Sequence, residues 1–298
     1  MKSVSMPWTR MFFNSACPCG SGQKSFKCCW RGDGQWEKTP VGPVVIPANS
    51  EPSVVNDRCY LSVLGDCSSR ITKEHFISRN ILERLTNSTL RIEGAGHIFG
   101  GKDTVEIGID GFSAKVPCDK HNSALGALDS AAEAAFSTIE ALKDNLLRFS
   151  KGSRIMKSLH ISSGLDIERW MVKVYCGLLA AGKIRSKSGR ALEMAQVGQP
   201  LIESLVGTQA LAFPLGLYMH SFADQPRRLG GISIGTVQLA DGSDGVGGLM
   251  LSLGPINLVL VVSEQYGRTF IDKNWFRHQT LSWKINEKGS RVTYLFTY

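Results

Sequence analysis

The grouping of its cysteines constrains this chain more than any other feature. Four of the eight cysteines lie close together, as Cys17-x-Cys19 followed by Cys28-Cys29. A chain of 298 residues, of which 43% are hydrophobic, can bury a sizeable core without disulfides. No secretory signal is recognisable near the amino terminus, so we expect a cytoplasmic protein, in which clustered thiols bind metal more often than they form disulfides or redox pairs. The spacing suits a closed zinc site with four thiolate ligands.

The stretch CPCGSGQKSFKCC at residues 17–29 resembles the SEC-C zinc motif, whose pattern is C-x-C-G-S-G-x-K-[FY]-K-x-C-[CH]. Ser25 and Phe26 depart from that pattern by one position and leave the four ligands in place. The resemblance implies a small zinc finger over residues 1–38 that binds a protein partner. Basic residues beside the cage either meet phosphates or an acidic protein surface or are ordinary solvated charges; they are Lys24, Lys27 and Arg31.

A proline-rich stretch separates this cluster from a second set of metal-ligand residues. Residues 39–52 hold four prolines, which favours an extended linker. Beyond it, Cys59 and Cys67 precede a second pair, Cys118 and His121, spaced as C-x2-H. Three thiols and one imidazole arranged as two pairs are typical of structural zinc. We therefore expect a second zinc site at these four residues.

The order of residues around the two pairs resembles the HNH, or ββα-metal, family of nucleases. Glu74 and His75 lie between the pairs, and Asn122 follows the second pair at the start of a helix. The resemblance implies two strands and a helix, within residues 53–150, that hold one divalent cation. It implies His75 as the general base and Glu74 and Asn122 as catalytic ligands of Mg²⁺ or Mn²⁺. Asp129, further along the same helix face, is expected to assist the metal or to be a charge near the helix amino terminus.

Hydrolysis of a phosphodiester needs these residue types. Histidine takes a proton from water near neutral pH, and a cation with oxygen ligands offsets the charge that develops on the phosphoryl and leaving oxygens. Adjacent residues of a strand point to opposite faces. Glu74 and His75 therefore serve one site only if the strand bends between them.

Three features of the same region depart from the family pattern or have a plainer interpretation. His75, taken alone, is typical of a satisfied histidine at a strand end. Ser113 stands where the family has an asparagine. Residues 89–116 form a longer insert than the motif requires, and we expect a hairpin there, with His97 in a surface loop.

The remaining residues, 151–298, are expected to form an α+β domain of unknown role. Apolar residues recur at helical spacing over residues 124–149 and again over 166–181, where Cys176 is expected to be a small buried hydrophobe. Strands are predicted from residue 231 onward, which favours an antiparallel sheet packed on helices.

Two hairpins are predicted within that carboxy-terminal sheet. The uncharged stretch 245–263 has alternating leucines and a Gly-Pro turn, which favours a buried hairpin over a membrane span. In the last hairpin, Trp283 and Ile285 are expected to oppose Val292 and its neighbours.

The sequence thus predicts an α+β protein with a zinc finger, an HNH-like unit with a zinc cage, and helices packed on an antiparallel sheet. A net charge of +8 and a pI of 9.1 favour a nucleic-acid partner, expected to be DNA. We expect an HNH-type endonuclease with His75 as its base. The alternative is a non-catalytic, zinc-stabilised adaptor that binds nucleic acid or a protein.

Overall fold

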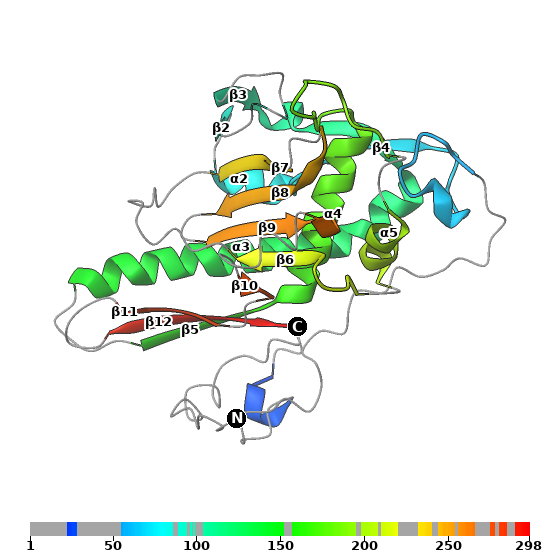
Figure 1. Cartoon of the computed structure of the whole chain (residues 1–298). Helices are drawn as coiled ribbons and strands as arrows, with labels where there is room; N and C mark the ends of the chain where they lie inside the picture. The colour runs from blue at the N-terminus through cyan, green and yellow to red at the C-terminus, as the bar shows by residue number, and fades with distance from the viewer. Residues whose placement is uncertain are drawn as a thin grey trace.

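The computed structural model is a mixed α+β structure (Figure 1). It describes residues 23–28, 55–85, 89–93, 96, 98, 104–151, 157–194, 198–207, 210–219, 232–239, 244–253, 256–265, 275–277, 280–284 and 290–298. In the predicted finger, the described part contains one short turn, η1 (Ser25–Lys27). The predicted linker and the rest of the finger lie outside the described residues.

Two strands and a long helix form the unit that carries the second cysteine set. Strand β1 (Ile71–His75) pairs antiparallel with β4 (Ser113–Cys118), and α3 (Asp119–Lys151) follows β4 directly. The short helix α2 (Arg79–Leu85) follows β1, and the turn η3 (Ile109–Gly111) precedes β4. The apolar positions predicted from their helical spacing are the buried face of α3: Leu125, Leu128, Ala132, Ala135, Phe136 and Ile139.

A seven-stranded sheet has the strand order β10-β6-β9-β8-β7-β2-β3. Its strands are β2 (Thr89–Glu93), β3 (Thr104–Gly108), β6 (Gly216–Met219), β7 (Ile232–Gln238), β8 (Val246–Leu253), β9 (Ile256–Val261) and β10 (Trp275–Phe276). The insert predicted as a hairpin is the β2–β3 pair, and β2 lies parallel to β7 with Ile92 opposite Ile232. Strands from both sides of residue 150 therefore share one sheet.

A smaller sheet has the order β11-β12-β5, with β5 (Lys157–Ser163), β11 (Thr280–Lys284) and β12 (Arg291–Thr297). Strands β11 and β12 form the expected hairpin, in which Trp283 pairs with Val292. The pairing of β12 with β5 is parallel. The sheets are thus mainly antiparallel, as expected, with one parallel pairing in each of the two larger ones, between strands far apart in sequence.

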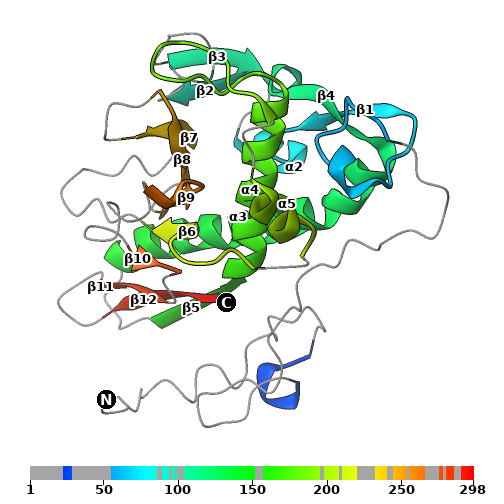
Figure 2. The ribbon, with the colours of Figure 1, turned by 45° about the vertical axis from the view of Figure 1, so that its right-hand side comes forward.

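Helix α4 (Gly164–Ala180) contacts the large sheet at β6 and β9 and the small unit at β4 and α3, so it lies between them (Figure 2). Ser163 caps its amino terminus by accepting a hydrogen bond from the backbone N–H of Asp166 at 3.1 Å. Cys176 is buried on it, as predicted. Helix α5 (Gln199–Val206) packs on α4. Because α4 lies between the large sheet and the small unit, few of its residues are exposed to water.

The uncharged stretch near residue 250 forms the predicted hairpin. Strands β8 and β9 pair antiparallel, with Leu249 opposite Leu260 and Leu251 opposite Leu258, and all four side chains are buried. Among the described helices, none has both the length and the apolar character needed to cross a membrane.

Candidate metal centre and the adjoining His75 face

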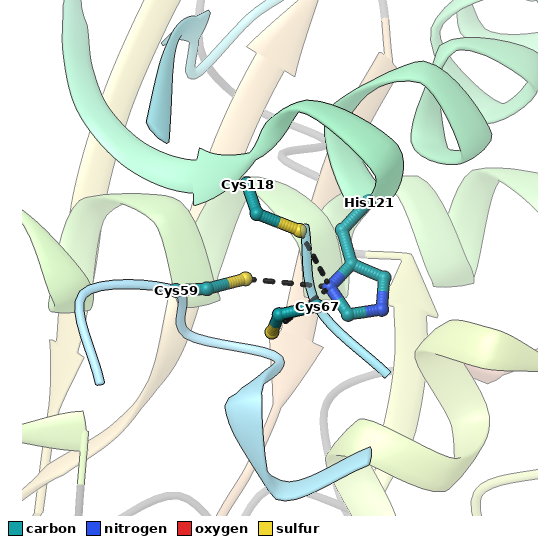
Figure 3. Close-up of side chains that lie close together, drawn as sticks. All are labelled: Cys59, Cys67, Cys118 and His121. Carbon is teal, nitrogen blue, oxygen red and sulfur yellow. Dashed lines mark hydrogen bonds between the residues drawn. The ribbon is translucent and has the colours of Figure 1, made fainter. Parts of the chain in front are cut away.

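Three cysteines and one histidine meet at the base of the β1–β4 pair (Figure 3). Cys59 and Cys67 lie in the segment before β1, Cys118 is the last residue of β4, and His121 is in the first turn of α3. The segment turns at Gly65, whose φ of 71° is left-handed and suits glycine. All four side chains are buried, and their ligand atoms lie within 4.8 Å of one another.

The distances within this Cys3His group match a tetrahedral zinc site. Nδ1 of His121 lies 3.3 Å from Sγ of Cys59, 3.3 Å from Sγ of Cys118 and 3.8 Å from Sγ of Cys67. Zinc bonds of about 2.3 Å to sulfur and about 2.0 Å to nitrogen, at tetrahedral angles, would place sulfur and nitrogen about 3.5 Å apart. The group can therefore hold a metal ion such as zinc, with four protein ligands and no position left for a substrate.

Side chains around the group orient its ligands. Nε2 of His121 lies 2.9 Å from Oδ1 of Asp66, which leaves Nδ1 to face the sulfurs. The Lys120 ammonium pairs with the other oxygen of the Asp66 carboxylate. The backbone N–H of Ser68 donates to Sγ of Cys118 at 3.4 Å. A carboxylate, an imidazole and the metal position thus lie in line, an arrangement common at structural zinc sites.

Burial and nearby hydrogen bonds shift the pKa values of the four side chains in different directions. Burial raises the pKa of Cys59 to about 12 and raises the pKa of Cys67. At Cys118 burial acts in the same direction, but hydrogen bonds from the backbone of His121 and Ser68 outweigh it and the pKa is lowered. Burial lowers the pKa of His121 against the opposing effect of Asp66, so the imidazole is neutral, as a ligand must be. A divalent cation would draw the thiol protons off.

The first predicted cage falls almost wholly outside the described residues. Cys17, Cys19 and Cys29 belong to that part, and so does His97 in the Gly-rich insert. Cys28 is described and is partly exposed. Within the described ranges, the Cys3His group is the one cluster of metal-ligand side chains.

Glu74 and Asp129, both expected to be ligands of a divalent ion, meet the same lysine. Nζ of Lys173 lies 2.8 Å from each oxygen of Asp129 and 3.1 Å from Oε1 of Glu74. Tyr60 donates its hydroxyl to Oε1 of Glu74 at 3.2 Å, and Trp170 donates its indole N–H to Oδ1 of Asp129 at 3.2 Å. The structure brings the two carboxylates together, but with an ammonium between them.

Burial and ion pairing act in opposite directions on Lys173 and on Glu74. The Lys173 side chain is 1% exposed and that of Glu74 is 2% exposed, whereas that of Asp129 is 28% exposed. Burial lowers the pKa of Lys173, but the charges of Glu74 and Asp129 outweigh burial and raise it, so the side chain stays an ammonium. Burial raises the pKa of Glu74 against the lowering effect of Lys173. As they stand, these carboxylates do not fit Mg²⁺ or Mn²⁺, because a cation already holds them.

His75 lies on the other face of β1, as alternation along a strand dictates. Its Nε2 is 3.4 Å from Oδ1 of Asp110, a residue of η3. The same carboxylate oxygen lies 3.5 Å from Arg79 and 3.8 Å from Lys73. We call these four residues, Lys73, His75, Arg79 and Asp110, the His75 face. The His75 side chain is 18% exposed, and the other three are about half exposed or more.

Asn122 and Ser113 do not join Glu74 or His75 through any hydrogen bond described in the structure. Nδ2 of Asn122 donates to Oγ1 of Thr72 at 3.0 Å and to the carbonyl of Lys73 at 3.3 Å, and so ties α3 to β1. Ser113 pairs with His75 across the strands, but its hydroxyl donates to the carbonyl of Asp110. Both side chains hold the backbone around the His75 face in place.

Sequence reasoning missed Lys173 and Asp66, as well as the three residues that join His75 on the His75 face. Lys173 interrupts the apolar run WMVKVYCGLL, and a charge inside such a run is a signal that it has a buried partner. Asp66 directly precedes the ligand Cys67, but an aspartate in a turn gives no sign that it contacts a histidine.

Neither a family model, nor a curated protein, nor a solved structure matches this chain.

Proposed function

We propose that the β1–β4–α3 unit is an HNH-type module that binds nucleic acid at the His75 face and cleaves a phosphodiester there. What supports the proposal is the combination of two antiparallel strands, a following helix and a Cys3His group at their base, with a histidine at the far end of β1. Zinc would staple this scaffold and take no part in the reaction. DNA is the proposed nucleic acid, and the net charge of +8 suits such a polyanion.

His75 is the proposed general base. We assign the ring proton to Nε2, which lies 3.4 Å from Oδ1 of Asp110, so that Nδ1 is the nitrogen that takes a proton from the attacking water. Burial lowers the pKa of His75 more than Asp110 raises it, so the ring is neutral near pH 7. Lys73 and Arg79 supply positive charge for the phosphate oxygens. These roles use only side chains of this chain.

The resemblance to HNH nucleases implies Mg²⁺ or Mn²⁺ held by Glu74, Asn122 and Asp129. Such an ion would neutralise charge on the transferring phosphoryl group. Lys173 satisfies two of those side chains, so no step of the proposed reaction is assigned to that ion. The SEC-C resemblance of residues 17–29 leads us to propose a second zinc, on Cys17, Cys19, Cys28 and Cys29, with a cytoplasmic protein partner.

Replacing the base tests this proposal. We expect His75→Ala to lower plasmid nicking by roughly 10²- to 10⁴-fold, because a general base contributes that much to proton transfer. The rate would be measured with supercoiled plasmid, with and without added Mg²⁺ or Mn²⁺, and zinc content would be measured alongside. Arg58→Ala, an exposed cation near the Cys3His end of the unit, is the matched control and should change nothing.

The pH profile gives a second arm of the same test. Because the pKa of His75 is lowered, cleavage should rise with pH below about 6.5, the ordinary histidine value, and stay level above it. Asp110→Asn removes a group that raises this pKa and should move the rise to lower pH. Unchanged nicking by His75→Ala would refute the assignment of the base.

A non-catalytic adaptor is the second candidate, and one specific observation favours it. Lys173 holds the two carboxylates that an HNH nuclease would use for its metal. This candidate predicts a salt-dependent gel shift with DNA that weakens in Lys73→Ala and Arg79→Ala, without strand scission under any of the metal conditions above.

A further inference from the structure

We infer that the Lys173 ammonium takes the place of a divalent cation between Glu74 and Asp129. The inference concerns cation binding and holds whether or not the proposed cleavage occurs. It assigns a role to a buried lysine that the proposed reaction does not use.

The contacts of Lys173 compensate its charge with two carboxylates. Both oxygens of Asp129 lie 2.8 Å from Nζ and Oε1 of Glu74 lies 3.1 Å from it. The Asp129 separations are those of charge-assisted N–H···O bonds, and the Glu74 contact is an ion pair. Magnesium would need oxygens at about 2.0–2.1 Å in an octahedron, so the two carboxylates are spaced for an ammonium rather than for that ion.

The surroundings leave little room for a second cation. Each carboxylate also accepts a hydrogen bond from a neutral group, Tyr60 at Glu74 and Trp170 at Asp129. The other oxygen of Glu74, Oε2, is buried without a hydrogen-bond partner among the described residues and faces Gly177, where a Cβ would approach it to 3.4 Å. A divalent ion beside a fixed ammonium would also be repelled by it. Removing the ammonium should therefore open a site that the natural chain lacks.

Terbium offers a direct probe, since Tb³⁺ prefers oxygen ligands and emits when a nearby tryptophan is excited. Trp170 touches Asp129, and the partial exposure of Asp129 gives the ion an approach. In the zinc-loaded full chain we expect no saturable Tb³⁺ emission that depends on Asp129. In Lys173→Ala we expect saturable emission with at least about tenfold tighter binding than in the natural chain, because an adjacent unit charge is gone.

Three further variants locate the site. Adding Asp129→Asn to Lys173→Ala should abolish the emission. Adding Trp170→Phe instead should abolish the emission but leave Mn²⁺ binding, measured by electron paramagnetic resonance. Arg84→Ala is the matched control, because Arg84 also pairs with carboxylates of α3, Glu133 and Glu140, but at the exposed surface. It should give no emission that depends on Trp170.

Two results would overturn the inference. One is Asp129-dependent binding of Tb³⁺ or Mn²⁺ by the natural chain, which would mean that a cation enters beside Lys173. The other is a folded, zinc-containing Lys173→Ala that binds neither ion. Should Lys173→Ala fail to fold, Lys173→Ala with Glu74→Gln removes the buried carboxylate, leaves the partly exposed Asp129, and is judged by the same outcomes. Loss of nicking in His75→Ala has no bearing on these readouts, so failure of either proposal can be told from failure of the other.

Discussion

Single side chains decide what the Cys3His group and its neighbours can do. The four ligands could be predicted because metal-ligand spacing is written in the sequence itself, as C-x2-H and an upstream pair of thiols. The partners of those ligands could not. Asp66 reaches His121, and Lys173 reaches Glu74, only because separate segments of the backbone bring them together. The local sequence pattern does not predict contacts between such distant residues.

Asp66 is the residue for which the structure makes a sharp claim about metal affinity. We expect Asp66→Asn to weaken zinc binding by roughly 10- to 100-fold, because the carboxylate fixes the tautomer and orientation of the His121 ring. Competition with a chromophoric chelator would measure the affinity. Asp57→Asn, an exposed aspartate of the same segment, should leave it unchanged. Equal affinity in the two variants would contradict a role for Asp66 in orienting the ring.

At the scale of helices and strands, the local sequence pattern predicted which elements form but not which distant strands pair. The spacing of apolar residues predicted α3 and α4, and alternation predicted the β8–β9 hairpin. Neither parallel pairing, β2 with β7 or β5 with β12, was predicted, because each joins segments far apart in sequence. Pairing of that kind depends on the whole fold rather than on any window of residues.

Helix α4 also shows why hydrophobic pattern alone describes a central helix incompletely. Glu168 accepts hydrogen bonds from Arg277 at 2.7 and 3.0 Å and from the backbone N–H of Leu217 at 2.9 Å. Arg169 donates to the carbonyls of Ser204 and Leu205, at the end of α5, where the helix dipole favours a cation. These buried charges fix how α4 meets its neighbours.

Gly248 lies where the backbone of β9 comes close to β8. A Cβ at Gly248 would lie 2.0 Å from the carbonyl oxygen of Leu260, so the strands would have to separate. We expect Gly248→Ala to lower the free energy of unfolding by roughly 1–3 kcal/mol or more. Gly126→Ala is the matched control: its Cβ meets nothing within 4 Å in α3, and it should raise that free energy by about 0.5–1 kcal/mol. Urea denaturation would compare them, and equal stability would be inconsistent with the close approach.

At the scale of the molecule, the candidate metal centre and the large sheet are connected through side-chain contacts with α4 and through the β2–β3 insert. Tyr60 and Glu74 connect the segment beside the ligands to Lys173 on α4, and the β2–β3 insert completes the edge of the sheet. The prediction of separate parts over residues 53–150 and 151–298 rested on the HNH resemblance of the first and on the helix and strand patterns of the second. Such local features could not reveal that an insert in the first part adds strands to a sheet in the second.

Removing a metal ion from the Cys3His group should therefore also destabilise elements outside the β1–β4–α3 unit. We expect chelation to unfold the β1–β4 pair, since its base is held by the four ligands, and to raise amide exchange in α4 by at least about tenfold. Hydrogen–deuterium exchange followed by mass spectrometry would report both. Peptides from β8 and β9 serve as an internal comparison. Exchange in α4 that is indifferent to zinc would show that the two regions are energetically independent.

The parallel pairing of β5 with β12 has a consequence for the order of events during synthesis. Residues 157–163 leave the ribosome long before residues 291–297, and at ordinary translation rates the interval is on the order of ten seconds. Until then one edge of β5 lacks its neighbour, and an uncovered edge is open to pairing with other chains. A nascent chain of this protein thus has an interval in which chaperones would be most useful, set by where its last strand is encoded.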